Sequence, residues 1–226
     1  MSLNGNYTFS HCISDINIGS LVGGTGAGLL DPNNRHLDRS NCQTGTLDAA
    51  SALSLDRRHL GNFTAVVVSP HFAARKLDTI ASNWMLSSSY RVQSASFLTV
   101  AAGTDRQLTG SNAQRAQRLP GNALCDHPNP SCWINPNAFG IPDQGTLGNS
   151  GRASVPGPGF WEIDTALSRT FNVRENVKLE TRGEAFNLTN SFRAGTPTTN
   201  RTSPTFGQIL TAQDPRIIQL ALKLVF

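Results

Sequence analysis

Four cysteines, with a histidine between two of them, are the residues whose types and spacing first suggest chemistry. In "CDHPNPSC", Cys125, His127 and Cys132 are three candidate metal ligands, but their spacing matches no common zinc site. Two cysteines separated by a short segment with two prolines are more simply explained as a disulfide, with free thiols as a third alternative. The sequence therefore favours a Cys125–Cys132 disulfide and predicts no metal site.

Cys12 and Cys42 flank the first long stretch without a strand pattern, so they form a second candidate pair. Four cysteines permit three connectivities, and the sequence does not choose among them.

Two further patterns suggest a cofactor site and a catalytic site. "GGTGAG" at Gly23–Gly28 fits neither the dinucleotide-binding pattern nor a phosphate-binding loop, and no helix pattern follows it. His11, His59, His71 and His127 lie among many serines and aspartates, but no G-x-S-x-G motif accompanies them. We therefore predict a flexible loop in place of a cofactor site, and a protein that is not an enzyme.

The amino-acid composition is typical of strands that have one apolar face and one uncharged polar face in contact with water. Hydrophobic residues make up 38% of the chain and charged residues 15%, so uncharged polar residues and glycine fill the difference. The 20 Gly and 12 Pro favour many turns. No stretch is long and apolar enough for a membrane-spanning helix. The net charge of +4 is scattered along the chain without a basic stripe, so nucleic-acid binding is not expected.

Alternation with a period of two recurs in six segments, and no segment has a convincing helical stripe. Most of these segments exceed the typical soluble strand of about 5–6 residues and reach the roughly 9–11 of a tilted membrane-crossing strand. The six predicted strands are Leu3–Ile13, Arg57–Ser69, Trp84–Val100, Phe160–Phe171, Val177–Leu188 and Arg216–Phe226.

The two faces of these strands differ sharply in polarity. Val177–Ala185 has small or apolar residues at every second position and four charged residues between them. Four charges on one face do not fit a dry core, but mixed signs fit a polar barrel lumen. A soluble sheet with one solvated face alternates equally well. The candidate lumen-lining residues are Arg91, Gln93, Lys178, Glu180, Arg182, Glu184, Gln219 and Lys223.

Long and short gaps alternate between the predicted strands. Residues 14–56, 101–159 and 189–215 are long gaps, whereas 70–83 and 172–176 are short. Outer-membrane barrels have this asymmetry, with long loops outside the cell and short turns on the periplasmic side. The polar stretch Ala102–Gly145, rich in Pro, Asn and Gly, predicts a long external loop without regular structure.

Five motifs follow one another in the second half of the chain: "WINPNAFGIPDQGTLGNSGR", "GPGFWEIDTALSRTF", "LETRGEAFNLTN", "SPTFGQI" and "DPRIIQLALKLVF". Together they resemble the C-terminal barrel strands of Oar-like TonB-dependent outer-membrane transporters, a group that often carries a carboxypeptidase-regulatory-like domain. "DRRHLGNFTAVVVSP" and "NWMLSSSYRVQSASFLTV" are similar to the preceding strands more loosely. One departure is Ser94-Ala95-Ser96-Phe97, where the family often has Ser-Gly-x-Pro and a bend.

The resemblance implies energy-coupled uptake through a barrel of about 22 strands with a plugged lumen. It also implies three kinds of partner: outer-membrane lipid, TonB acting through the plug, and the barrel-assembly machinery reading the terminal Phe226. The chain "MSLNGNYTFSHC…" opens without a signal-peptide pattern, and no plug segment is present. We therefore expect residues 1–226 to be the C-terminal part of a longer receptor barrel in the bacterial outer membrane.

Six strands are fewer than the roughly eight of the smallest bacterial barrels. Unpaired peptide groups at two sheet edges in hydrocarbon would cost about tens of kcal/mol, more than a typical folding stability of roughly 5–15. The chain alone is therefore not expected to form a pore. The alternative is a secreted or surface-displayed β-rich binding module, with two covered sheet faces.

Overall fold

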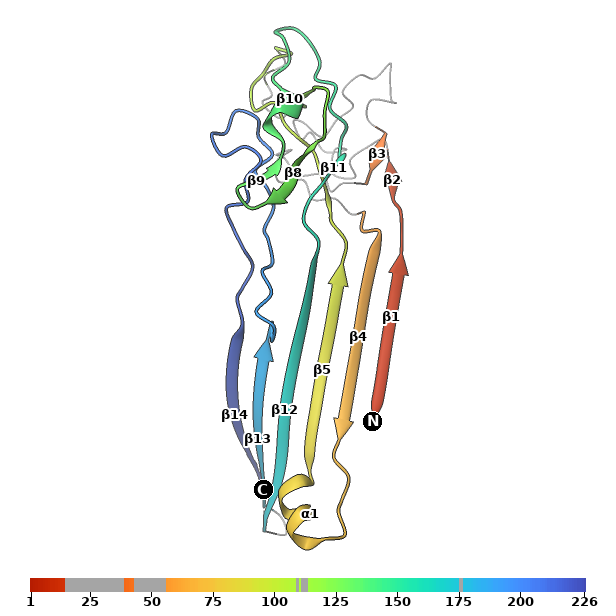
Figure 1. The fold of residues 1–226 in the computed structure, drawn as a ribbon, viewed down its shortest axis with the longest axis vertical. Coiled ribbons are helices and arrows are strands. Elements are labelled where there is room, and N and C mark those ends of the chain that lie inside the picture. Colours follow the sequence, from red (N-terminus) through yellow and green to blue (C-terminus); the bar gives the residue numbers. More distant parts are fainter. Residues whose placement is uncertain (15–38, 43–55, 109, 111–113, 175–176) are drawn as a thin grey trace.

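The long strands form one six-stranded antiparallel sheet in which sequence neighbours lie side by side (Figure 1). The computed structural model describes residues 1–14, 39–42, 56–108, 110, 114–174 and 177–226. Each of the six predicted segments overlaps one of the strands, so the antiparallel all-β prediction is confirmed. The strands are β1 (Ser2–Phe9), β4 (His59–Val68), β5 (Trp84–Gln93), β12 (Phe160–Arg174), β13 (Val177–Phe186) and β14 (Ile217–Val225).

The pairing register gives this sheet one polar and one apolar face. Residues directly opposite each other in neighbouring strands point to the same side of a sheet. Arg91 lies opposite Glu162 on one side and Asn62 on the other, and Glu180 lies opposite Lys223. The alternate positions carry side chains such as Leu3, Phe63, Leu86, Trp161, Leu179 and Leu220. The alternation visible within each strand thus adds up across the whole sheet.

The sheet is open. Among the described residues, β1 pairs with β4 and β14 pairs with β13, and neither has a partner on its other edge. No described helix is long and apolar enough to cross a membrane.

Two of the predicted strands leave the sheet several residues before their predicted ends. The segment Trp84–Val100 breaks after Gln93, and Phe97–Leu98 forms β6, which pairs with β11 (Val155–Pro156). Leu98 and Val100 leave the sheet because they are buried in a separate apolar cluster. At the other break, β1 ends at Phe9, and β2 (Ile13–Ser14) pairs with β3 (Ser40–Asn41).

The expectation of a structureless loop over Ala102–Gly145 is wrong. The described residues of 94–159 fold together with 198–209 at the upper end of the sheet, and we call them the loop unit (Figure 1). Short elements hold it: β7 (Gln117–Arg118) pairs with β10 (Phe139–Gly140), and β8 (Leu124–Asn129) with β9 (Cys132–Ile134). The 3-10 helix η2 (Pro136–Ala138) connects β9 to β10.

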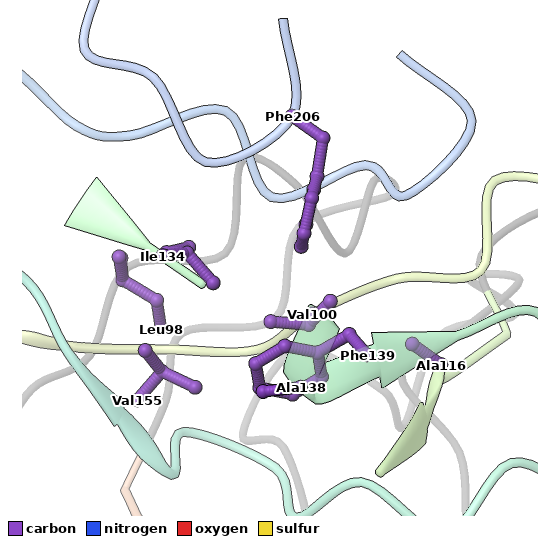
Figure 2. Packing of buried hydrophobic residues seen from close by; sticks show 8 residues of the cluster. All are labelled: Leu98, Val100, Ala116, Ile134, Ala138, Phe139, Val155 and Phe206. Atoms are coloured by element: carbon purple, nitrogen blue, oxygen red, sulfur yellow. The ribbon is translucent and has the colours of Figure 1, made fainter. Parts of the chain in front are cut away.

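A small apolar core explains why the loop unit is ordered. Phe139 packs edge-on against Phe206 at 6.2 Å between ring centroids, and most of the cluster is less than 5% exposed. These residues come from distant parts of the chain, so no local periodicity indicates them. Figure 2 shows the eight cluster residues: Leu98, Val100, Ala116, Ile134, Ala138, Phe139, Val155 and Phe206.

The four described cysteines form two disulfides, Cys12–Cys42 and Cys125–Cys132. This connectivity is one of the three that the sequence permits. Cys125–Cys132 closes the hairpin of β8 and β9, next to the buried Ile134.

We expect the double substitution Cys125→Ser/Cys132→Ser to lower the stability of the loop unit by about 2–3 kcal/mol, the chain-entropy value for so short a closed loop. Hydrogen exchange of the Ile134 amide should report it, because that amide donates to the Gly207 carbonyl within the unit. The control Cys12→Ser/Cys42→Ser leaves this hairpin closed. Equal protection of Ile134 in both variants and in the wild type would contradict the prediction.

Candidate functional site

The eight residues predicted to line a lumen lie together on the polar face of the sheet. β5, β13 and β14 contribute them, and the register aligns their rows: Glu184 lies opposite Gln219, and Glu180 opposite Lys223. Arg182 contacts Glu184 at 2.6 Å, and the Gln219 amide also donates to Glu184. The row is therefore a surface of mixed, partly compensated charge.

A charge cluster surrounds Glu162 on the polar face, close to the end of the sheet that adjoins the loop unit. Its carboxylate contacts Arg91 at 3.2 Å and Arg193 at 2.6 Å, and Arg91 also reaches Asp164 at 3.3 Å. Glu162 is 5% exposed, so both guanidinium groups meet a desolvated carboxylate. We call Arg91, Glu162, Asp164 and Arg193 the polar-face cluster.

Arg193 connects the last long gap of the chain to the sheet. Its other terminal nitrogen donates to the Asp214 carbonyl at 2.8 Å, and its own carbonyl accepts from Gln213 at 2.9 Å. At the start of the same segment, the Asn187 amide donates to Asp164 at 2.9 Å. Both ends of the segment 187–216 are thereby attached to the polar-face cluster.

Sequence analysis identified Arg91 but missed the other three cluster members. Glu162 and Asp164 alternate with Trp161 and Ile163, so the period-two pattern of that strand was sufficient to find them. Arg193 lies outside every strand pattern. No local signal indicates that it folds back onto β12.

Aromatic rings lie at both ends of the apolar face. Near the loop unit, Phe63 stacks on Tyr90 at 6.2 Å and Tyr90 lies 6.4 Å from Trp161. Toward the opposite end, the Arg169 guanidinium lies 5.3 Å from the ring centroid of Trp84 and 4.6 Å from that of Phe171. We call these two groups of rings the aromatic belts. Along β12 the belts are separated by about 26 Å, counted from Trp161 to Arg169, which lies opposite Trp84, at a strand rise of roughly 3.3 Å per residue.

The histidines do not form a catalytic arrangement in the described residues. Asp78 accepts from Ser82, from the Phe72 amide and from His71, so the carboxylate lies between serine and histidine. A triad needs the histidine in that middle position. The Ser82 hydroxyl first, and then the Phe72 amide, lower the pKa of Asp78, as expected of a carboxylate that accepts hydrogen bonds.

The remaining chemical candidates give no site either. Tyr7 hydrogen-bonds His59 at 2.7 Å, and His11 contacts Asn41 at 3.3 Å. His127 is exposed beside the Cys125–Cys132 disulfide. No group of three or more His, Cys, Asp or Glu suited to a metal occurs in the described part of the chain. The "GGTGAG" segment lies outside the described residues.

A two-faced antiparallel sheet with aromatic rings at both ends of its apolar face is typical of outer-membrane barrels. A family model described as an outer membrane beta barrel domain matches residues 1–219. The chain belongs to this outer-membrane β-barrel family.

The outer-membrane β-barrel protein is therefore located in the bacterial outer membrane, as the sequence predicts. Comparisons with curated proteins and with solved structures found no match.

Proposed function

We propose that this outer-membrane β-barrel protein is the C-terminal barrel segment of an Oar-like TonB-dependent transporter. It contributes wall strands and an external loop unit to energy-coupled uptake of a substrate. The apolar face contacts lipid, and the polar face lines the lumen around a plug. The chain has no catalytic role in this proposal.

The observation that carries the proposal is the separation of the two faces. Charged residues gather on the polar face of β5, β12, β13 and β14, whereas the apolar face has two aromatic belts. The roughly 26 Å between belts, shortened by strand tilt, is comparable with the apolar band of about 25 Å in outer-membrane barrels. A soluble module with both faces covered would bury Leu220 and Leu222, which are mostly exposed.

The open edges support a larger barrel. β1 and β14 each present one row of unpaired backbone groups within the described structure. In hydrocarbon these rows need partner strands, because each unsatisfied group costs several kcal/mol. The resemblance of the motifs from Trp133 onward supports about 22 strands in total, with TonB acting through the plug. Phe226, 95% exposed, is free for recognition by the barrel-assembly machinery.

Photo-crosslinking in intact cells tests this proposal. A crosslinking amino acid at Lys223, on the polar face, is expected to capture plug polypeptide, whereas the same probe at the neighbouring Leu222 is expected to meet lipid and capture none. The sequence upstream of the Met1 codon should encode the plug and further alternating strands. Equal capture at both positions, or a secreted protein that is soluble without detergent, would favour the β-rich binding module instead.

A further inference from the structure

A cation lies on the apolar face at the end away from the loop unit. From Trp161 to Phe171, Arg169 is the only charged residue that β12 directs to this face. On a lipid-facing surface a cation costs about 2–4 kcal/mol at the midplane but only about 0–1 near the interface. The position of Arg169 therefore fits the level of lipid headgroups.

The Arg169 guanidinium has unused hydrogen-bonding capacity. Its five N–H groups are all donors. One terminal nitrogen donates to the Thr79 carbonyl, and the buried Nε has no partner among the described residues. The rings of Trp84 and Phe171 fix the position of the group. A fixed, incompletely paired guanidinium is well suited to a phosphate.

A groove on the same face begins beside this cation. Its lining consists of Trp84, Leu167, Thr181, Gly183, Leu220 and Leu222, together with Arg182 and Ala221 from the alternate positions of β13 and β14. Arg169 lies opposite Thr181 in the register, and Leu167 lies opposite Gly183, so the groove extends from the level of Arg169 toward the middle of the strands. It exists because Gly183 has no side chain between Leu167 and Leu220. Its mostly apolar walls suit an acyl chain.

The short helix α1 (Arg75–Ala81), between β4 and β5, lies at the strand ends away from the loop unit (Figure 1). None of its residues is buried, and Leu77 and Ile80 are 48% and 69% exposed. Its last turn contacts the apolar face, because the Trp84 indole donates to the Ile80 carbonyl at 2.9 Å. Arg75 and Lys76 add exposed positive charge, while Asp78 is occupied by Phe72 and Ser82.

We propose that the apolar face around Arg169, at the end of the sheet away from the loop unit, is a binding site for one anionic phospholipid. The lipid belongs to the membrane leaflet that surrounds this end of the strands. Arg169 binds the lipid phosphate, and one acyl chain lies in the groove over Gly183. Leu77 and Ile80 insert among neighbouring acyl chains, with Arg75 and Lys76 at headgroup level. The inference rests on the proposed contact of the apolar face with lipid, and it adds a specific site on that surface.

Native mass spectrometry of the protein purified from outer membranes in mild detergent, titrated with phosphatidylglycerol, tests the site. Arg169→Gln is expected to weaken lipid retention about tenfold, the effect of losing one charge-assisted contact. Arg174→Gln is the matched control, since it removes a cation at the same strand end beside Val177. Lipid retention by the Arg174 variant should stay within about twofold of the wild type. The reason is that Arg169 lies over Trp84, which lines the groove, whereas Arg174 lies farther along the strand beside Val177.

Gly183→Val provides a second variant that keeps the charge but fills the groove, and it should also reduce retention. An added Cβ meets only Leu220, at 3.4 Å, so the strand tolerates it. Inorganic phosphate alone should not displace the lipid. Equal retention by the Arg169 and Arg174 variants, no lipid in the wild type, or displacement by inorganic phosphate would overturn the proposal.

Electrophoretic mobility before and after heating identifies the folded barrel in each variant. If the protein is in the outer membrane and its electrophoretic mobility changes on heating, but it holds no lipid, the lipid site would be refuted and the transporter proposal would stand. A protein with no membrane-embedded form would refute both.

Discussion

Ile218→Arg is expected to destabilise the membrane-embedded protein by about 2–4 kcal/mol, the cost of a cation at the bilayer midplane on a lipid-facing strand. Ile218 is 66% exposed on the apolar face and lies opposite Ala185, which in turn lies opposite Thr165. The level of Thr165 is midway between the two aromatic belts, which lie at the levels of Trp161 and of Trp84 opposite Arg169. Urea titration in phospholipid vesicles, followed by tryptophan fluorescence, measures the change.

Gln219→Arg is the matched control for this substitution. It is the next residue on the same strand, but its side chain lies on the polar face and donates to Glu184. An arginine there meets that carboxylate, so the expected change is within about 0.5 kcal/mol, as for other surface positions. Similar losses in the two variants would show that the faces are not divided between lipid and water.

Glu162→Gln is expected to lower the unfolding free energy by about 3–5 kcal/mol, because it leaves the nearly buried guanidinium of Arg193 without its counter-charge. Arg193, whose side chain is 11% exposed, contacts Glu162 directly and also holds the Asp214 carbonyl. The segment 187–216 should therefore loosen along with the sheet. Unfolding by urea reports the first effect, and limited proteolysis within 187–216 reports the second.

Glu180→Gln serves as the control, since Glu180 shares the polar face but forms no ion pair in the described structure. It should change neither stability nor proteolysis appreciably. In the double variant with Arg193→Met, part of the Glu162→Gln loss should be recovered, because the unpaired charge is gone. A loss that is fully additive would mean that the two residues are not coupled.

Strand positions and faces were predictable from the sequence because they depend on a local property. In "IIQLALKLVF" and in Val177–Ala185, every second residue already differs in polarity, and a strand converts that alternation directly into two faces. The gap lengths likewise separated long connections at one end from short ones at the other. The family comparison supports the outer-membrane assignment made from these patterns.

The breaks in the strands and the loop unit could not be predicted this way. The sequence predicts one strand over Trp84–Val100, yet Leu98 and Val100 leave the sheet to pack with Ile134, Phe139 and other residues far away in the chain. Burial in such a cluster depends on contacts between segments, and no short window of sequence contains both partners.

The sequence by itself determined which residues alternate, where six strands lie and which side chains share a face, because these follow from a period of two within one segment. Only the tertiary structure decided which cysteines pair, that Arg193 reaches Glu162, and that Gly183 opens a groove beside Arg169. Each of these depends on the register and on the return path of the chain, which bring together residues separated by long connections.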